Sequence, residues 1–198
     1  LGATGPAVAA QYHANQLELE RERPSARWLP RLLNAARLGD TATRRQALRA
    51  MLAAGKDNRR PRAERETILI NAESEAAWLV HAQPRASGNH MLLAEIRGAR
   101  AATMDGDSKQ AATVELRSAA AGDWDEAVRL NPTNPRTRIA AGWAWVELEA
   151  THPLAVSHAR AHFTEALRID DLRKPEEVQR LRPVEREPVE AWLRAPQP

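Results

Sequence analysis

The chain has 198 residues, of which 43% are hydrophobic and 28% are charged, and its formal net charge is +3. It contains no cysteine, which excludes disulfides, thiolate catalysis and cysteine-based zinc sites. A single Phe, a single Tyr and few runs of Val or Ile leave little material for a β-sheet, and no apolar stretch of about 18 residues could span a membrane. The composition therefore predicts an all-α protein without a membrane span.

The N-terminal part of the chain is predicted to form one helix followed by a helix hairpin. Segment 1–24 is interpreted as a helix, because the stretch from Pro6 to Glu22 lacks breakers, and we expect this helix to end at Pro24. Over 25–56, apolar residues recur every three or four positions, which is the spacing of one buried helical face. The pair Gly39 and Asp40 divides this segment, and two helices joined by so short a turn must lie antiparallel.

The middle of the chain is predicted to continue as helical hairpins. Segment 55–62 has no apolar residue and contains two breakers, so it is the predicted linker. Segment 63–121 then holds further hairpins, with breaks expected at Pro84 and around Gly106. Gly122 is expected to interrupt or bend the last of these helices.

Segment 122–171, with the two residues before it, carries the clearest repeat pattern. Small residues stand where paired helices would cross, aromatic residues recur in the helices, and a proline closes one turn; these positions are Ala120, Trp124, Ala127, Pro132, Gly142, Trp145, Ala159, Phe163 and Ala166. In this pattern the chain resembles a tetratricopeptide repeat. The resemblance implies antiparallel helix hairpins stacked as a short, irregular α-solenoid.

The spacing of the repeat predicts where the pattern is irregular and how the chain ends. Trp124 and Phe163 are 39 residues apart, whereas the family period is about 34. We place the excess in a lengthened turn over 149–154. The whole chain, 1–198, is interpreted as one helical-repeat domain in which segment 172–198 caps the array, with Trp192 packed on the last hairpin.

The resemblance also implies a binding site. Tetratricopeptide proteins bind peptides or protein surfaces on a concave face lined by the first helix of each repeat. In this chain that face would present Arg136, Ile139, Trp143, Val146 and Glu147. Trp143 and Trp145 lie roughly 200° apart around a helix, so the two rings cannot both pack between the two helices of one hairpin. Trp143 is therefore predicted either to line the groove or to pack against the preceding helix.

Residue types that could carry chemistry do not form a complete motif. His158 and His162 are four residues apart and share a helical face, with His152 nearby, but no third metal ligand is fixed beside them, so we predict no metal. Acidic pairs occur at helix ends or on exposed faces, where acids are ordinarily solvating residues: Glu73 with Glu75, Asp123 with Asp125, and Asp170 with Asp171. Without a nucleophile motif or phosphate loop, we predict no catalytic residue and no cofactor.

Positive charge is concentrated near the N-terminus. Residues 21–65 carry thirteen Arg and Lys against four acids. The candidate anion-binding residues there are Arg44, Arg45, Arg49, Arg59, Arg60, Arg62 and Arg65. They could form a solvated surface, or they could bind an anionic membrane surface, an anionic protein or nucleic acid. Nucleic acid is disfavoured because aromatics suited to base stacking are not interleaved with these residues.

The sequence predicts a non-catalytic scaffold or accessory subunit that binds another protein or peptide in a bacterial, membrane-associated complex. The alternative function is electrostatic binding through segment 21–65. A bacterial source is indicated because 26 of the 29 basic residues are Arg, a bias typical of GC-rich genomes. The chain starts at Leu1 without Met, which favours an extracytoplasmic or membrane-attached location over the cytoplasm, although a cloning boundary would look the same.

Overall fold

The computed structural model describes residues 28–104, 110–174, 177–178 and 180–195. Over these residues the chain forms eight α-helices and no strand, which confirms the predicted all-α class. The predicted helix over 1–24 lies outside the described residues. The helices are α2 (Trp28–Leu38), α3 (Thr41–Lys56), α4 (Arg62–Ala82), α5 (Ser87–Thr103), α6 (Gln110–Leu130), α7 (Pro135–Val146), α8 (Ala155–Asp171) and α9 (Pro183–Arg194).

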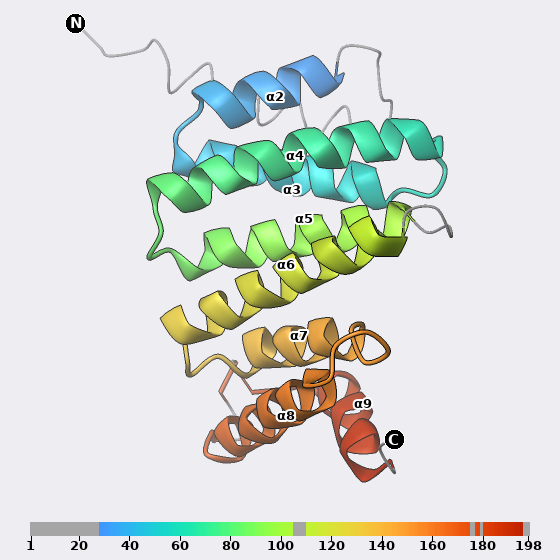
Figure 1. Ribbon diagram of the computed structural model, residues 1–198. Helices are drawn as coiled ribbons and strands as arrows, with labels where there is room; N and C mark the ends of the chain where they lie inside the picture. The colour runs from blue at the N-terminus through green and yellow to red at the C-terminus, as the bar shows by residue number, and fades with distance from the viewer. Residues whose placement is uncertain (1–27, 105–109, 175–176, 179, 196–198) are drawn as a thin grey trace, which may run out of the picture.

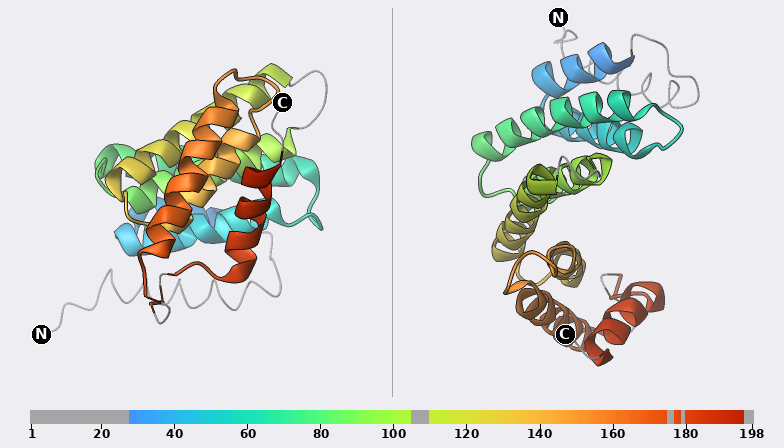
Figure 2. Two further views of the ribbon diagram at one scale, coloured as in Figure 1. Left: turned by 90° about the horizontal axis from the view of Figure 1, so that it is seen from below. Right: turned by 45° about the vertical axis from the view of Figure 1, so that its right-hand side comes forward.

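The helices are stacked in chain order as an α-solenoid (Figure 1). Each helix packs against the next one along the chain, and α3 also contacts α5. The stack curves, with α7 on the inner side of the curve and α9 folded back at its C-terminal end (Figure 2). None of the described helices combines the length and the apolarity that crossing a bilayer would require.

The hydrophobic core follows the stack as three successive clusters. The first is formed by α2 to α5 and holds the large aliphatic residues, with Ile68 of α4 fully buried. The second connects Ala94 of α5 to α6 and α7. The third reaches from Ala121 of α6 to Val189 of α9. Each cluster joins helices that are consecutive along the chain, which is the local organisation of a repeat protein.

Local sequence signals set the starts of two helices. Asp40 caps α3, because its side chain accepts a hydrogen bond from the Thr43 backbone N–H at 2.8 Å. Asn134 caps α7 in the same way, accepting from the Arg136 N–H at 3.0 Å. Pro135 then occupies the first helical turn, where its missing N–H has no cost. The turns predicted at Gly39–Asp40 and at Pro132 are confirmed.

Two glycines allow close contact between neighbouring helices. A Cβ atom on Gly55 would lie 2.5 Å from Leu69 Cδ2, so Gly55 is a packing position within α3. The predicted linker over 55–62 is therefore wrong at its N-terminal end, since α3 continues through Lys56. Similarly, a Cβ atom on Gly142 would collide with the ring of Phe163. This contact brings α7 and α8 together, as the repeat pattern predicts.

Two other predictions concern the continuity of helices. The interruption expected at Gly122 is wrong, because α6 runs without a break from Gln110 to Leu130. Gly122 is exposed, and its neighbours Ala121 and Trp124 are buried, so their packing outweighs the roughly 1 kcal/mol cost of a helical glycine. The lengthened turn over 149–154 is confirmed, since α7 ends at Val146 and α8 begins at Ala155.

Candidate partner-binding site

The five predicted groove residues lie on α7 or at its C-cap, but their surroundings differ. Trp143 remains 36% exposed, and the side chain of Glu147 is 58% exposed. Ile139 and Val146 are half-buried against the third core cluster. Arg136 has a side chain that is 40% exposed but is bound by other residues of the chain, so the part of the set that is open to a partner lies at the C-terminal end of α7.

The exposed ring of Trp143 is supported by a row of aromatic contacts. Its centroid lies 4.9 Å from that of Phe163 on α8, with the rings edge to face. Phe163 makes a second edge-to-face contact, at 5.1 Å, with Trp192 of α9. Trp143 therefore packs on the following helix on one side and is open on the other. The contact expected between Trp192 and the last hairpin is present.

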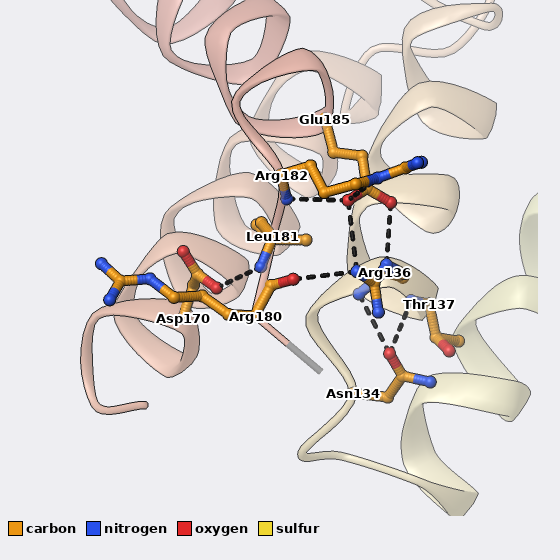
Figure 3. Close-up of polar contacts among 8 residues, drawn as sticks. All are labelled: Asn134, Arg136, Thr137, Asp170, Arg180, Leu181, Arg182 and Glu185. Carbon is orange, nitrogen blue, oxygen red and sulfur yellow. Dashed lines mark hydrogen bonds and ion pairs between the residues drawn. The ribbon is translucent and has the colours of Figure 1, made fainter. Parts of the chain in front are cut away.

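Arg136, at the other end of α7, is bound by the C-terminal segment (Figure 3). Its Nε donates to Glu185 Oε1 at 2.7 Å, and its Nη2 donates to the Arg180 carbonyl oxygen at 2.8 Å. Glu185 also accepts from the backbone N–H of Arg182 at 2.8 Å. The hydrogen bond from Arg136 is the main reason that the pKa of Glu185 falls to about 2. Arg136 is thus occupied while α9 is docked.

A second anchor of the C-terminal segment is the carboxylate of Asp170 on α8. This residue is fully buried, and its Oδ1 accepts from the Leu181 backbone N–H at 2.6 Å (Figure 3). Its Oδ2 accepts from Arg186 Nη1 at 2.9 Å. A buried carboxylate needs such partners, because burying an unpaired charge is costly. Asp170 therefore fixes the start of the C-terminal segment against α8.

Sequence reasoning missed these two anchors. Asp170 was expected to be a solvating residue at a helix end or on an exposed face; it lies at the end of α8, but the solvating role is wrong because the residue is fully buried. Glu185 had no predicted role. A local signal for α9 was present, since Pro183 and Glu185 are residue types that favour the first turn of a helix. No local signal relates Glu185 to Arg136, which lies 49 positions earlier in the chain.

The three histidines surround Trp145. His158 stacks on its ring with a centroid distance of 4.3 Å, and His152 contacts the ring edge to face at 5.2 Å. Trp145 Nε1 donates to Asp125 Oδ1 at 3.1 Å, and His162 Nε2 lies 2.8 Å from the same oxygen. These residues tie α6, α7 and α8 together. Within the described ranges, no group of three or more His, Asp or Glu is arranged to hold a metal ion.

The other acids of the predicted pairs are bound by arginines of neighbouring elements. The contacts are those of Glu73 with Arg97 and Arg100, Glu75 with Arg37, Asp123 with Arg97, and Asp171 with Arg186. Burial raises the pKa of Asp123, against the opposing effect of Arg97. The four carboxylates thus have ion-pair partners that connect successive parts of the stack.

The basic residues near the N-terminus are partly engaged within the fold. Four of them donate to protein oxygens: Arg44 to the Gly39 carbonyl, Arg45 to Asn89, Arg60 to Glu64, and Arg65 to Asn58. The Arg44 guanidinium also lies 4.1 Å above the ring of Trp78. Arg49, Arg59 and Arg62 are exposed. The predicted anion-binding set is therefore not one uniform surface.

Comparison of the chain with protein-family models, with curated proteins and with solved structures gave no match.

Proposed function

We propose that this protein is a non-catalytic scaffold or accessory subunit, built from tetratricopeptide-like hairpins, that binds a partner protein on the inner side of α7. The observation that carries this proposal is the half-packed ring of Trp143. The inner position of α7 and the exposure of Glu147 add a surface on which a peptide or helix could lie. A bacterial, membrane-associated complex remains the proposed setting.

Trp143 has the properties of a binding anchor. Tryptophan is enriched among the residues that dominate protein interfaces. The contact with Phe163 limits the motion of the ring, so less side-chain entropy is lost when a partner covers it. Glu147, which lies one helical turn after Trp143, approaches Arg117 to 3.7 Å, and these opposite charges can orient a polar partner.

The proposal is tested by affinity capture from cells of the source organism, with wild type, Trp143→Ala and Trp78→Ala as baits. Trp78 is the matched control, because it is an exposed tryptophan, 49% accessible, on the distant helix α4. We expect one stoichiometric protein with wild type and Trp78→Ala. Truncating an interface anchor costs about 2 kcal/mol, so Trp143→Ala should bind it roughly thirtyfold more weakly.

Salt separates this function from electrostatic binding. A protein held by Trp143 should stay bound in high salt, whereas contacts of exposed arginines with an anionic surface weaken steeply. Capture of only lipid or nucleic acid, at low salt alone, would favour the electrostatic function. Equal retention of the protein by Trp143→Ala, with an unchanged thermal unfolding curve, would contradict the proposed site.

A further inference from the structure

The C-terminal helix α9 rests on a surface that is suited to bind a helix. We define the α9 cradle as the surface formed by Arg136 of α7 together with Phe163 and Asp170 of α8. Charged groups lie at one end of the cradle, and an aromatic ring lies at the other. Phe163 also contacts Trp143, so the cradle adjoins the proposed binding site directly.

The residues of α9 that meet the cradle form one helical face. Glu185 binds Arg136, Arg186 binds Asp170, Val189 is fully buried, and Trp192 packs on Phe163. These four residues are spaced at i, i+1, i+4 and i+7, which places them on one side of a helix. The opposite side is open, since Val184 is 68% exposed. The cradle therefore recognises an amphipathic helix with an acidic first turn and an aromatic residue two turns later.

Several features make α9 a weakly held occupant. It has 12 residues, a length at which an isolated helix is marginal, and among them Val189 is the one buried residue. Pro188 lies inside the helix, where it removes one backbone hydrogen bond. A surface pocket of about 420 Å³, lined by Asp170, Arg186 and Glu190 among others, leaves one edge of the contact between α8 and α9 open to solvent.

We propose that the α9 cradle is the docking site for an amphipathic helix of the partner protein, and that α9 is an exchangeable ligand which inhibits this docking until it is displaced. The inference rests on the proposed function, because it specifies the partner class and the regulation of that same site. The partner helix would reproduce the pattern of Glu185, Arg186, Val189 and Trp192. Its aromatic residue would then lie on Phe163, next to Trp143.

The test uses the full chain and a fluorescent synthetic peptide with the sequence of residues 180–195. Val189→Asp in the full chain releases α9 and leaves the cradle residues intact. Val184→Asp is the matched control, since it adds the same charge to the exposed side of α9. If the cradle of the wild type is vacant about a tenth of the time, Val189→Asp should bind the peptide about tenfold more tightly than wild type. Val184→Asp should bind like wild type.

A charge exchange keeps the test decisive if Val189→Asp does not fold. In the full-chain variant Arg136→Glu, the native peptide and the native α9 both present Glu185 to a like charge. A peptide carrying Glu185→Arg should bind this variant about tenfold more tightly than the native peptide does, whereas wild type should show the reverse preference. Equal binding of the two peptides, or no binding of either, would overturn the proposal.

The oligomeric state tests whether α9 of a second copy of this chain, and not a helix of a partner protein, occupies the α9 cradle. A wild-type dimer detected by light scattering, and lost in Val189→Asp, would show that the cradle is filled by α9 of a second copy, which would overturn the assignment to a partner protein. A monomer is the expected result. These measurements use purified components, so their failure is distinguishable from a failure to capture a partner through Trp143.

Discussion

The two ends of the stack are stabilised in different ways. At the N-terminal end, α2 to α5 share a core cluster of large aliphatic side chains, among which Leu48, Met51 and Ile68 are completely buried. At the C-terminal end, α9 has one fully buried side chain, Val189, and a half-buried Trp192 that packs on Phe163. Its N-terminal half is attached by the ion pairs of Glu185 with Arg136 and of Arg186 with Asp170. The first arrangement resembles the interior of a domain, and the second resembles a bound ligand.

This difference shows how one solenoid can be stable and still exchange contacts. Burial of apolar surface is not directional and resists changes of salt and pH, whereas ion pairs depend on both. In a stack with nearest-neighbour contacts, the terminal helix can detach without loss of the rest. We therefore expect stability to be concentrated in α2 to α5 and exchange to be concentrated at α9.

The largest expected effect comes from the N-terminal cluster. Ile68→Ala removes a side chain with no exposure and leaves a cavity, so it should lower the free energy of unfolding by about 2–5 kcal/mol. Urea unfolding followed by circular dichroism measures this change. Ile70→Ala is the matched control, because Ile70 is on the same helix but is 43% exposed. A similar loss in both variants would contradict the assignment of the core.

A smaller effect, of opposite sign at two positions, is expected from glycines. Gly142→Ala places a methyl group in the ring of Phe163 and should destabilise the α7–α8 hairpin by roughly 1–3 kcal/mol. Gly122→Ala, in the middle of α6, meets nothing within 4 Å and should stabilise the protein by about 0.5–1 kcal/mol. Thermal unfolding of the two variants decides this prediction, and a destabilising Gly122→Ala would show that the exposed face of α6 is covered.

Helix caps and glycines differ in how well the sequence alone predicts their role. Apolar spacing and caps are local signals, so the hairpin turns at Asp40 and Asn134 were predictable. A glycine between two helical segments is ambiguous, because a break and a close contact use the same residue type. Gly55 was interpreted as part of a linker and Gly122 as an interruption or bend, and both lie inside helices.

Within the candidate site, the role of Trp143 as a groove residue stays a prediction, while the occupation of Arg136 was not predictable. The partner of Arg136 is chosen by the fold, which brings Glu185 to it across 49 residues. The burial of Asp170 has the same origin, since it depends on the return of the chain at Leu181. Such long-range pairings leave no periodic trace in the sequence.

Acid should weaken the docking of α9 before it affects the N-terminal cluster. The pKa of Glu185 is lowered from 4.5 to about 2 by its hydrogen bond with Arg136. A lowered pKa means that the carboxylate stabilises the docked state fully above about pH 4.5, and that this contribution is lost as the pH falls toward 2. The methyl resonances of Val189, followed by NMR, should report release of α9 in this window, while those of Ile68 shift later.

The control for this titration is Glu185→Gln, which removes the titrating group. Its Val189 resonances should indicate a more weakly docked α9 at neutral pH, with less further change between pH 4.5 and 2. If the wild-type Val189 resonances move only together with those of Ile68, α9 is not attached independently of the rest of the stack, and the contrast between the two ends would fail.

The smallest expected effect is the loss of an exposed ion pair at the C-terminal end of the stack. It tests whether exposed ion pairs contribute measurably to the thermal stability of this end. Arg168 and Glu165 form a two-point pair on α8, with N–O distances of 2.6 and 2.8 Å, and the hydrogen bond from Arg168 lowers the pKa of Glu165. Solvent screens this pair, because 59% of the Arg168 side chain is exposed. Arg168→Ala should therefore shift Tm by no more than about 2 °C and leave the Val189 resonances unchanged. A larger shift would show that an exposed ion pair within α8 contributes more to the stability of this end than its screening by solvent predicts.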